Sequence, residues 1–158
     1  MVSTSSTTDL APLDEIELKQ SLLPFGQSRM LPKAAYLDDA VLDWERRNIF
    51  GDGWVCVGRA DELAEGSMRT YPVGEFSVLV VRDGDDLRAF ENACRHRGHE
   101  LLPCGGSAHG RRVMVCPYHA WTYNLDGSLK AAPRFEEEAV QGMGLNAVPV
   151  VDWHGWLF

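Results

Sequence analysis

Long apolar segments are missing from this 158-residue sequence: no run approaches the roughly 20 residues that span a bilayer. The first eight residues also lack the basic start and apolar centre of a secretory signal peptide. These two absences exclude a membrane protein and predict a cytoplasmic protein with no membrane partner. The length fits one domain with its own hydrophobic core.

Positive charge is scarce as well. The sequence has 15 Lys and Arg against 23 Asp and Glu, which gives a net charge of −8 at pH 7. Proteins that bind nucleic acid neutralise phosphates with clustered basic side chains. The acidic balance therefore excludes nucleic acid as the partner.

Only four residues are cysteine, and two of them stand beside histidine in mixed pairs. Cys94 and His96 form a C-x-H motif, and Cys116 and His119 form a C-x-x-H motif, with nineteen residues between His96 and Cys116. One thiolate and one imidazole from each of two short loops suit a [2Fe–2S] cluster of the Rieske type, in which two histidines replace two cysteines on one iron. A single tetrahedral zinc ion is the alternative, although zinc fingers usually pair Cys with Cys and His with His. A further alternative is that the spacing of these residues arises by chance.

The other two cysteines have different surroundings. Cys56 lies in the apolar run 54–57, which predicts a buried, inert thiol. Cys104 lies in a glycine-rich segment, where partial exposure is expected. A disulfide between them is possible, but a reducing compartment disfavours it.

Short β-prone segments and turns dominate the sequence after residue 53. The expected strands are 54–57, 69–73, 76–82, 87–91, 112–115, 121–123, a strand from 129, 148–151 and 156–158. Before them, an Asp at 38 or 39 can cap a helix that continues to about residue 50, where Gly51 and Gly53 end it. This pattern predicts a mainly β protein, a small antiparallel sandwich with one N-terminal helix.

The residues around both motifs carry a family resemblance. Segments 92–98 (NACRHRG) and 115–123 (VCPYHAWTY) closely resemble the N-terminal Rieske domain of ring-hydroxylating oxygenase large (alpha) subunits. The resemblance covers residues 29–158 and implies a Rieske-type sandwich with two cluster-binding loops. Residues 1–28 are expected to form a flexible segment before it. The implied ligands of the [2Fe–2S] cluster are Cys94, His96, Cys116 and His119.

The resemblance also implies partners. Such a domain accepts electrons from a ferredoxin or a flavin-containing reductase, and the resemblance implies that the full-length mono- or dioxygenase is a homotrimer. Positive charge gathers near the motifs and predicts a docking surface for an acidic electron donor, formed by Arg95, Arg97, Arg111 and Arg112. Arginines that merely keep an exposed tip hydrated are the alternative.

One part of the family pattern is missing. The family's catalytic domain holds a mononuclear iron with two histidines and a carboxylate, but after His119 the sequence has only His154. We therefore expect the catalytic C-terminal domain to be absent, and the 158 residues alone to hydroxylate nothing. A free-standing Rieske ferredoxin that only carries electrons is the alternative.

The remaining histidines are expected to be structural or solvated. We expect His99 to be an exposed loop residue, His109 to be solvated and His154 to lie in a turn. In the oxygenase-type pattern, His99 and Tyr118 fill positions where respiratory Rieske proteins carry extra cysteines. Trp121 and Tyr123 are expected to pack beneath the second loop.

Overall fold

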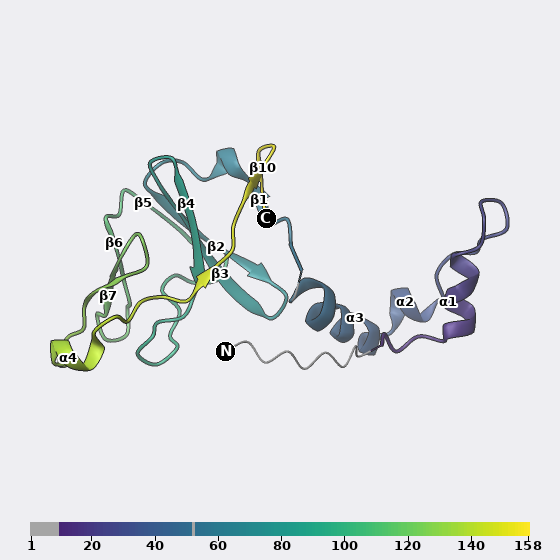
Figure 1. Cartoon of the computed structure of the whole chain (residues 1–158), viewed down its shortest axis with the longest axis horizontal. Coiled ribbons are helices and arrows are strands. Elements are labelled where there is room, and N and C mark those ends of the chain that lie inside the picture. Colours follow the sequence, from purple (N-terminus) through teal and green to yellow (C-terminus); the bar gives the residue numbers. More distant parts are fainter. Residues whose placement is uncertain (1–9, 52) are drawn as a thin grey trace. The chain divides into compact units, whose positions relative to one another are not determined.

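The structure, a computed structural model, describes residues 10–51 and 53–158 and divides into two units, Met1–Gly53 and Trp54–Phe158 (Figure 1). The first unit contains α1 (Glu15–Ser21), α2 (Ala34–Leu37), α3 (Asp39–Glu45) and the π-helix η1 (Arg46–Phe50). The Asp38 side chain caps α3 by accepting a hydrogen bond from the Ala40 backbone N–H at 3.0 Å. The predicted capped helix is thus confirmed, and it ends at Gly51 as expected, with a π-helical last part.

The sequence predicted one N-terminal helix, and the structure has more. Helix α1 lies inside the segment 1–28 that was expected to be flexible, and residues 1–9 of that segment lie outside the described residues. No helix in the two described ranges is both long and apolar enough to cross a membrane.

An antiparallel five-stranded sheet organises the second unit. Its order is β5-β2-β3-β4-β9, formed by β2 (Ser67–Val73), β3 (Phe76–Asp83), β4 (Asp86–Glu91), β5 (Ser107–His109) and β9 (Ala147–Val148). Along β3 the buried side chains alternate between the faces of the sheet: Leu79 and Val81 belong to one core cluster, whereas Val80 belongs to the other. The central sheet is therefore covered on both faces.

Two three-stranded sheets complete the unit. One has the order β6-β7-β8, with β6 (Val113–Val115), β7 (Thr122–Asn124) and β8 (Leu129–Ala131). The other has the order β1-β11-β10, with β1 (Gly58–Arg59), β10 (Asp152–Trp153) and β11 (Trp156–Leu157). Trp121 and Tyr123 join Leu79 in the first core, and Leu157 joins Val80 in the second. The mainly β, antiparallel fold class is confirmed.

The segment around Cys56 was predicted wrongly. It was expected to be a buried strand, but Cys56 and Trp54 are exposed and the strand β1 begins only at Gly58. The physical reason is that β11 is short: it pairs with Gly58 and Arg59, and one further hydrogen bond joins Val57 N–H to Leu157 O. Cys104 is also exposed, and both thiols are free, without the disulfide that was the alternative.

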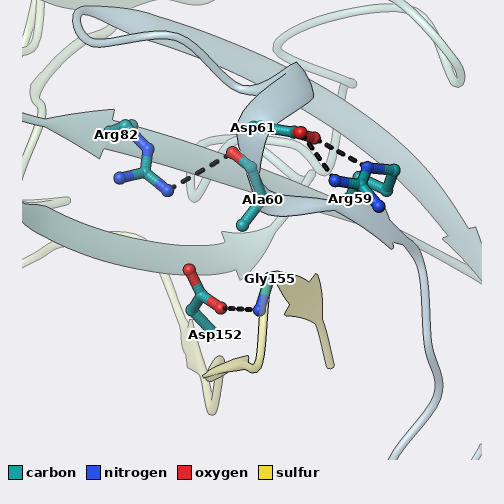
Figure 2. A network of polar contacts seen from close by, with 6 residues as sticks. All are labelled: Arg59, Ala60, Asp61, Arg82, Asp152 and Gly155. Carbon is teal, nitrogen blue, oxygen red and sulfur yellow. Dashed lines mark hydrogen bonds and ion pairs between the residues drawn. The ribbon is translucent and has the colours of Figure 1, made fainter.

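A polar hollow of about 710 Å³ lies beside the β1-β11-β10 sheet, and Figure 2 shows polar contacts of residues that line it. Arg82 donates to Ala60 O at 3.4 Å on one side of it, and Gly155 N–H donates to Asp152 Oδ1 at 2.8 Å on another. The latter bond closes the turn in which His154 has a φ of 51°, so the prediction of a turn residue is confirmed. None of the four motif residues lines this hollow.

Candidate metal centre

The first motif lies on a loop that follows β4, and Asn92 ties its two ends together. The Asn92 side chain is buried; its oxygen accepts from the N–H groups of Leu101 and Leu102, at 3.0 and 3.2 Å. Its amide donates to Leu102 O at 2.7 Å and to Ser77 Oγ at 3.0 Å. One polar side chain therefore fixes the loop onto the central sheet, a role that the sequence analysis missed.

Both motif loops use the same backbone frame. In the first, Cys94 N–H donates to His99 O at 2.9 Å and Gly98 N–H donates to Cys94 O at 2.8 Å. In the second, between β6 and β7, Cys116 N–H donates to Trp121 O at 2.8 Å and Ala120 N–H donates to Cys116 O at 3.0 Å. The spacings are five and four residues in each case.

The fourth residue after each cysteine also has the same left-handed backbone, with a φ of 69° at Gly98 and 59° at Ala120. This conformation is natural for glycine and strained for alanine. The two motifs are thus two copies of one tight turn, which holds each cysteine in the same way.

The two sulfurs lie in the core. Cys94 is 3% exposed and Cys116 is 2% exposed. The Tyr123 hydroxyl accepts from Arg95 N–H at 3.0 Å and lies 3.2 Å from Cys94 Sγ, so its own proton is available to the sulfur. Burial, followed by the contact with Cys94, raises the pKa of Tyr123 well above its usual range. The phenol therefore stays protonated and can donate to a thiolate.

The second sulfur is served by backbone groups instead. Burial raises the pKa of the Cys116 thiol, and hydrogen bonds from the backbone of Tyr118 and His119 oppose that rise. Backbone N–H donors of this kind stabilise a metal-bound thiolate.

The two imidazoles lie against each other. The ring centroids of His96 and His119 are 4.7 Å apart, with an interplanar angle of 72°. Nδ1 of His119 is buried and has no hydrogen-bond partner. Burial, and then the charges of His96 and Arg97, lower the pKa of His119. A neutral ring with an unused buried nitrogen is the state that a metal ligand requires.

The four side chains do not converge on one point. Across residues 10–51 and 53–158, no group of three or more His, Cys, Asp or Glu could hold a single metal ion. A structural zinc site needs four ligands around one ion. A Rieske cluster asks each iron for only two protein ligands, a cysteine pair on one and a histidine pair on the other. The residues present fit that group.

The predictions for the neighbouring residues are mostly confirmed. His99 is exposed, with Nδ1 2.8 Å from Glu100 O, and His109 is exposed at the end of β5. Trp121 and Tyr123 are buried beneath the second loop. No pattern in the sequence predicted a role for Phe135, whose ring lies against His96.

Comparison with known proteins decides the family. The family profile described as Rieske [2Fe-2S] domain matches residues 53–149. The chain belongs to the Rieske [2Fe-2S] domain family. The family implies a [2Fe–2S] cluster.

Among similar proteins, the carnitine monooxygenase oxygenase subunit of Acinetobacter baumannii is 40% identical over 133 residues, covering 80% of this chain and 35% of that protein. The quaternary ammonium Rieske monooxygenase CntA in complex with L-carnitine matches with a TM-score of 0.68 and 36% identity, over 80% of this chain and 37% of that one. Naphthalene 1,2-dioxygenase from Rhodococcus sp. matches with a TM-score of 0.75 and 28% identity, over 90% and 34%.

These matches make the Rieske domain homologous to that of oxygenase alpha subunits, as the resemblance predicted. The chain spans about a third of the length of the curated relatives.

Proposed function

We propose that this chain is the electron-accepting Rieske domain of an oxygenase alpha subunit. In this proposal Cys94 and Cys116 hold one iron of the cluster, and His96 and His119 hold the other. The observation that carries it is the duplicated turn, which brings two buried thiols and two adjoining imidazoles together. The bound cluster would supply one-electron transfer.

The chain's own residues divide the remaining work. Tyr123 donates to the sulfur of Cys94, and backbone N–H groups face the sulfur of Cys116. The imidazoles are only partly buried, so the nitrogen-held side of the site is the one nearer to a partner. Exposed Arg95 and Arg97 flank it and favour an acidic ferredoxin or reductase as donor.

The acceptor and substrate belong to a full-length oxygenase, which we propose to be a homotrimer with a mononuclear iron in a further domain. Quaternary ammonium compounds are the favoured substrate class, because the carnitine monooxygenase relatives share 36–40% identity with this chain and the Rhodococcus naphthalene dioxygenase shares 28%. A free-standing ferredoxin remains the second candidate.

The cofactor is tested by purifying the chain anaerobically. Two irons and two acid-labile sulfides per chain are expected, with Rieske-type absorption and a reduced-state EPR signal. His99→Ala should leave all of these unchanged, because His99 is exposed and outside the ligand set. Stoichiometric zinc without sulfide would contradict the proposal.

The two candidate functions are separated by turnover. Given reductase, oxygen and carnitine, the 158-residue chain should cycle its cluster without forming hydroxylated product. Fusing it to the remaining two thirds of a carnitine monooxygenase subunit should restore product formation if it is an oxygenase domain. A fusion that assembles both iron centres and still forms no product favours the ferredoxin.

A further inference from the structure

The ring of His96 is enclosed by aromatic side chains in a way that the ring of His119 is not. Trp121 lies parallel to His96, with ring centroids 5.0 Å apart and an interplanar angle of 6°. Phe135 lies nearly perpendicular to both, at 5.4 Å and 78° from His96 and at 5.2 Å and 83° from Trp121. His119 instead contacts Tyr118, an exposed residue of its own loop. The two imidazoles therefore have unequal surroundings.

Phe135 reaches this position from a third segment. It follows β8, outside both motif loops, and the preceding residue Arg134 has a φ of 71°. Non-glycine residues in this region carry strain that the surrounding structure must hold. The Phe135 N–H donates to Ala132 O at 3.1 Å and closes the turn.

Phe135 is also an unusual core contact, because it is 46% exposed while Trp121 is 2% exposed. Its ring borders a hollow of about 470 Å³ formed with residues of β8 and α4 (Glu137–Val140). The ring thus contacts both His96 and Trp121, is itself partly exposed to solvent, and lies outside the central core.

We infer that Phe135 is a positioning residue for His96: it clamps the imidazole against Trp121 and limits the access of water to the nitrogen-held side of the cluster. This inference rests on the proposed function. Apolar shielding around a metal site controls its local dielectric and thereby its potential. Reduction by the ferredoxin or reductase adds one electron and one negative charge to the cluster, and a drier site disfavours that added charge.

The test uses the complete chain carrying Phe135→Ala, Phe135→Leu or Phe135→Tyr. Phe135→Ala should raise the reduction potential, because water then stabilises the reduced form, and should speed removal of iron by a chelator about tenfold. Pulsed EPR should show a change in one of the two histidine nitrogen couplings. Phe135→Tyr keeps the ring and should restore the wild-type potential and couplings. Phe135→Leu keeps apolar cover without the ring and should fall between them.

Phe76→Ala is the matched control, because Phe76 is a 65% exposed phenylalanine at the start of β3. It should change neither potential nor couplings. If Phe135→Ala does not retain the cluster, Phe135→Leu decides the matter by the same measurements. Cluster-bearing Phe135→Ala protein, or Phe135→Leu protein where Phe135→Ala loses the cluster, with wild-type potential and couplings overturns this inference alone. Wild-type protein without iron and sulfide overturns the proposed function, and this inference with it.

Discussion

The two motif loops have the same backbone and different surroundings. In each loop the cysteine N–H donates to the carbonyl five residues later. The cysteine carbonyl accepts from the N–H of the left-handed residue four positions later. The first loop, however, is held by side chains from elsewhere: Asn92 closes it, Tyr123 reaches Cys94, and Trp121 and Phe135 enclose His96. The backbone frame is duplicated, whereas the side-chain environment is not.

This difference separates assembly from tuning. A repeated backbone turn suffices to present one sulfur and one nitrogen from each loop. Hydrogen bonds to sulfur and exposure to solvent set the potential of an iron–sulfur cluster, and these differ between the loops: a side-chain hydroxyl reaches Cys94, whereas backbone N–H groups serve Cys116. We therefore expect equal substitutions in the two loops to have equal effects on assembly and unequal effects on potential.

The largest expected effect is loss of the cluster. Cys94→Ser and Cys116→Ser should each abolish stoichiometric iron and sulfide, because in the proposed site each removes one of two sulfur ligands to the same iron. Metal analysis and the visible spectrum measure this. Cys104→Ser is the control, since Cys104 is free and exposed. A cluster that survives in one of the two ligand variants would show that the loops are not equivalent in assembly.

Exchanging the left-handed residues should change stability in opposite directions. A β-carbon at Gly98 would meet no heavy atom within 4 Å, so Gly98→Ala carries only the backbone strain. That strain, partly offset by a less flexible unfolded chain, should lower the free energy of unfolding by about 1 kcal/mol. Ala120→Gly should raise it by a similar amount.

Chemical denaturation of the holoprotein measures both changes, with cluster content checked first. A stabilising Gly98→Ala would mean that the shared turn is not the frame that the two loops depend on. The double variant should lie close to wild type if the two turns act independently.

How far the sequence could predict this site depends on the range of the interactions. The proposed ligand pairs are local, so the motifs alone are enough to propose Cys94 and His96. The strands β2 to β4 follow from β-prone runs around the turn at Gly84. The shared turn is also local, yet alanine at position 120 concealed it, because its left-handed conformation is atypical of that residue.

Long-range contacts were out of reach. Strand β5 is three residues long and exists through its pairing with Ser67–Arg69 of β2, about forty residues earlier in the chain. The Phe135 contact with His96 likewise depends on how the segment after β8 folds back. The apolar run that includes Cys56 was wrongly predicted to be a strand because the neighbouring strand β11 is too short to pair with it.

Removing the phenol that serves the first loop should shift the potential moderately. Tyr123→Phe deletes the hydroxyl 3.2 Å from Cys94 Sγ and keeps the buried ring. A hydrogen bond to sulfur favours the more negative reduced cluster, so the potential should fall by about 40 mV, equivalent to roughly 1 kcal/mol. Protein-film voltammetry measures the shift. Tyr118→Phe is the control in the second loop, where the backbone supplies the donors; an equal shift there would remove the distinction between the loops.

The smallest effect should come from surface charge. Arg97 is exposed on the first loop, and Arg97→Glu should slow reduction by an acidic donor several-fold at low ionic strength. The difference should shrink as salt rises, because the Debye length is about 10 Å at 0.1 M. Stopped-flow reduction across a salt series measures it. Arg59→Glu makes the same change of charge on β1, in the sheet that packs on the other face of the central sheet, and should leave the rate unchanged. Equal slowing by both variants would mean that the net charge of the protein, rather than a docking surface at the first loop, governs the encounter with the donor.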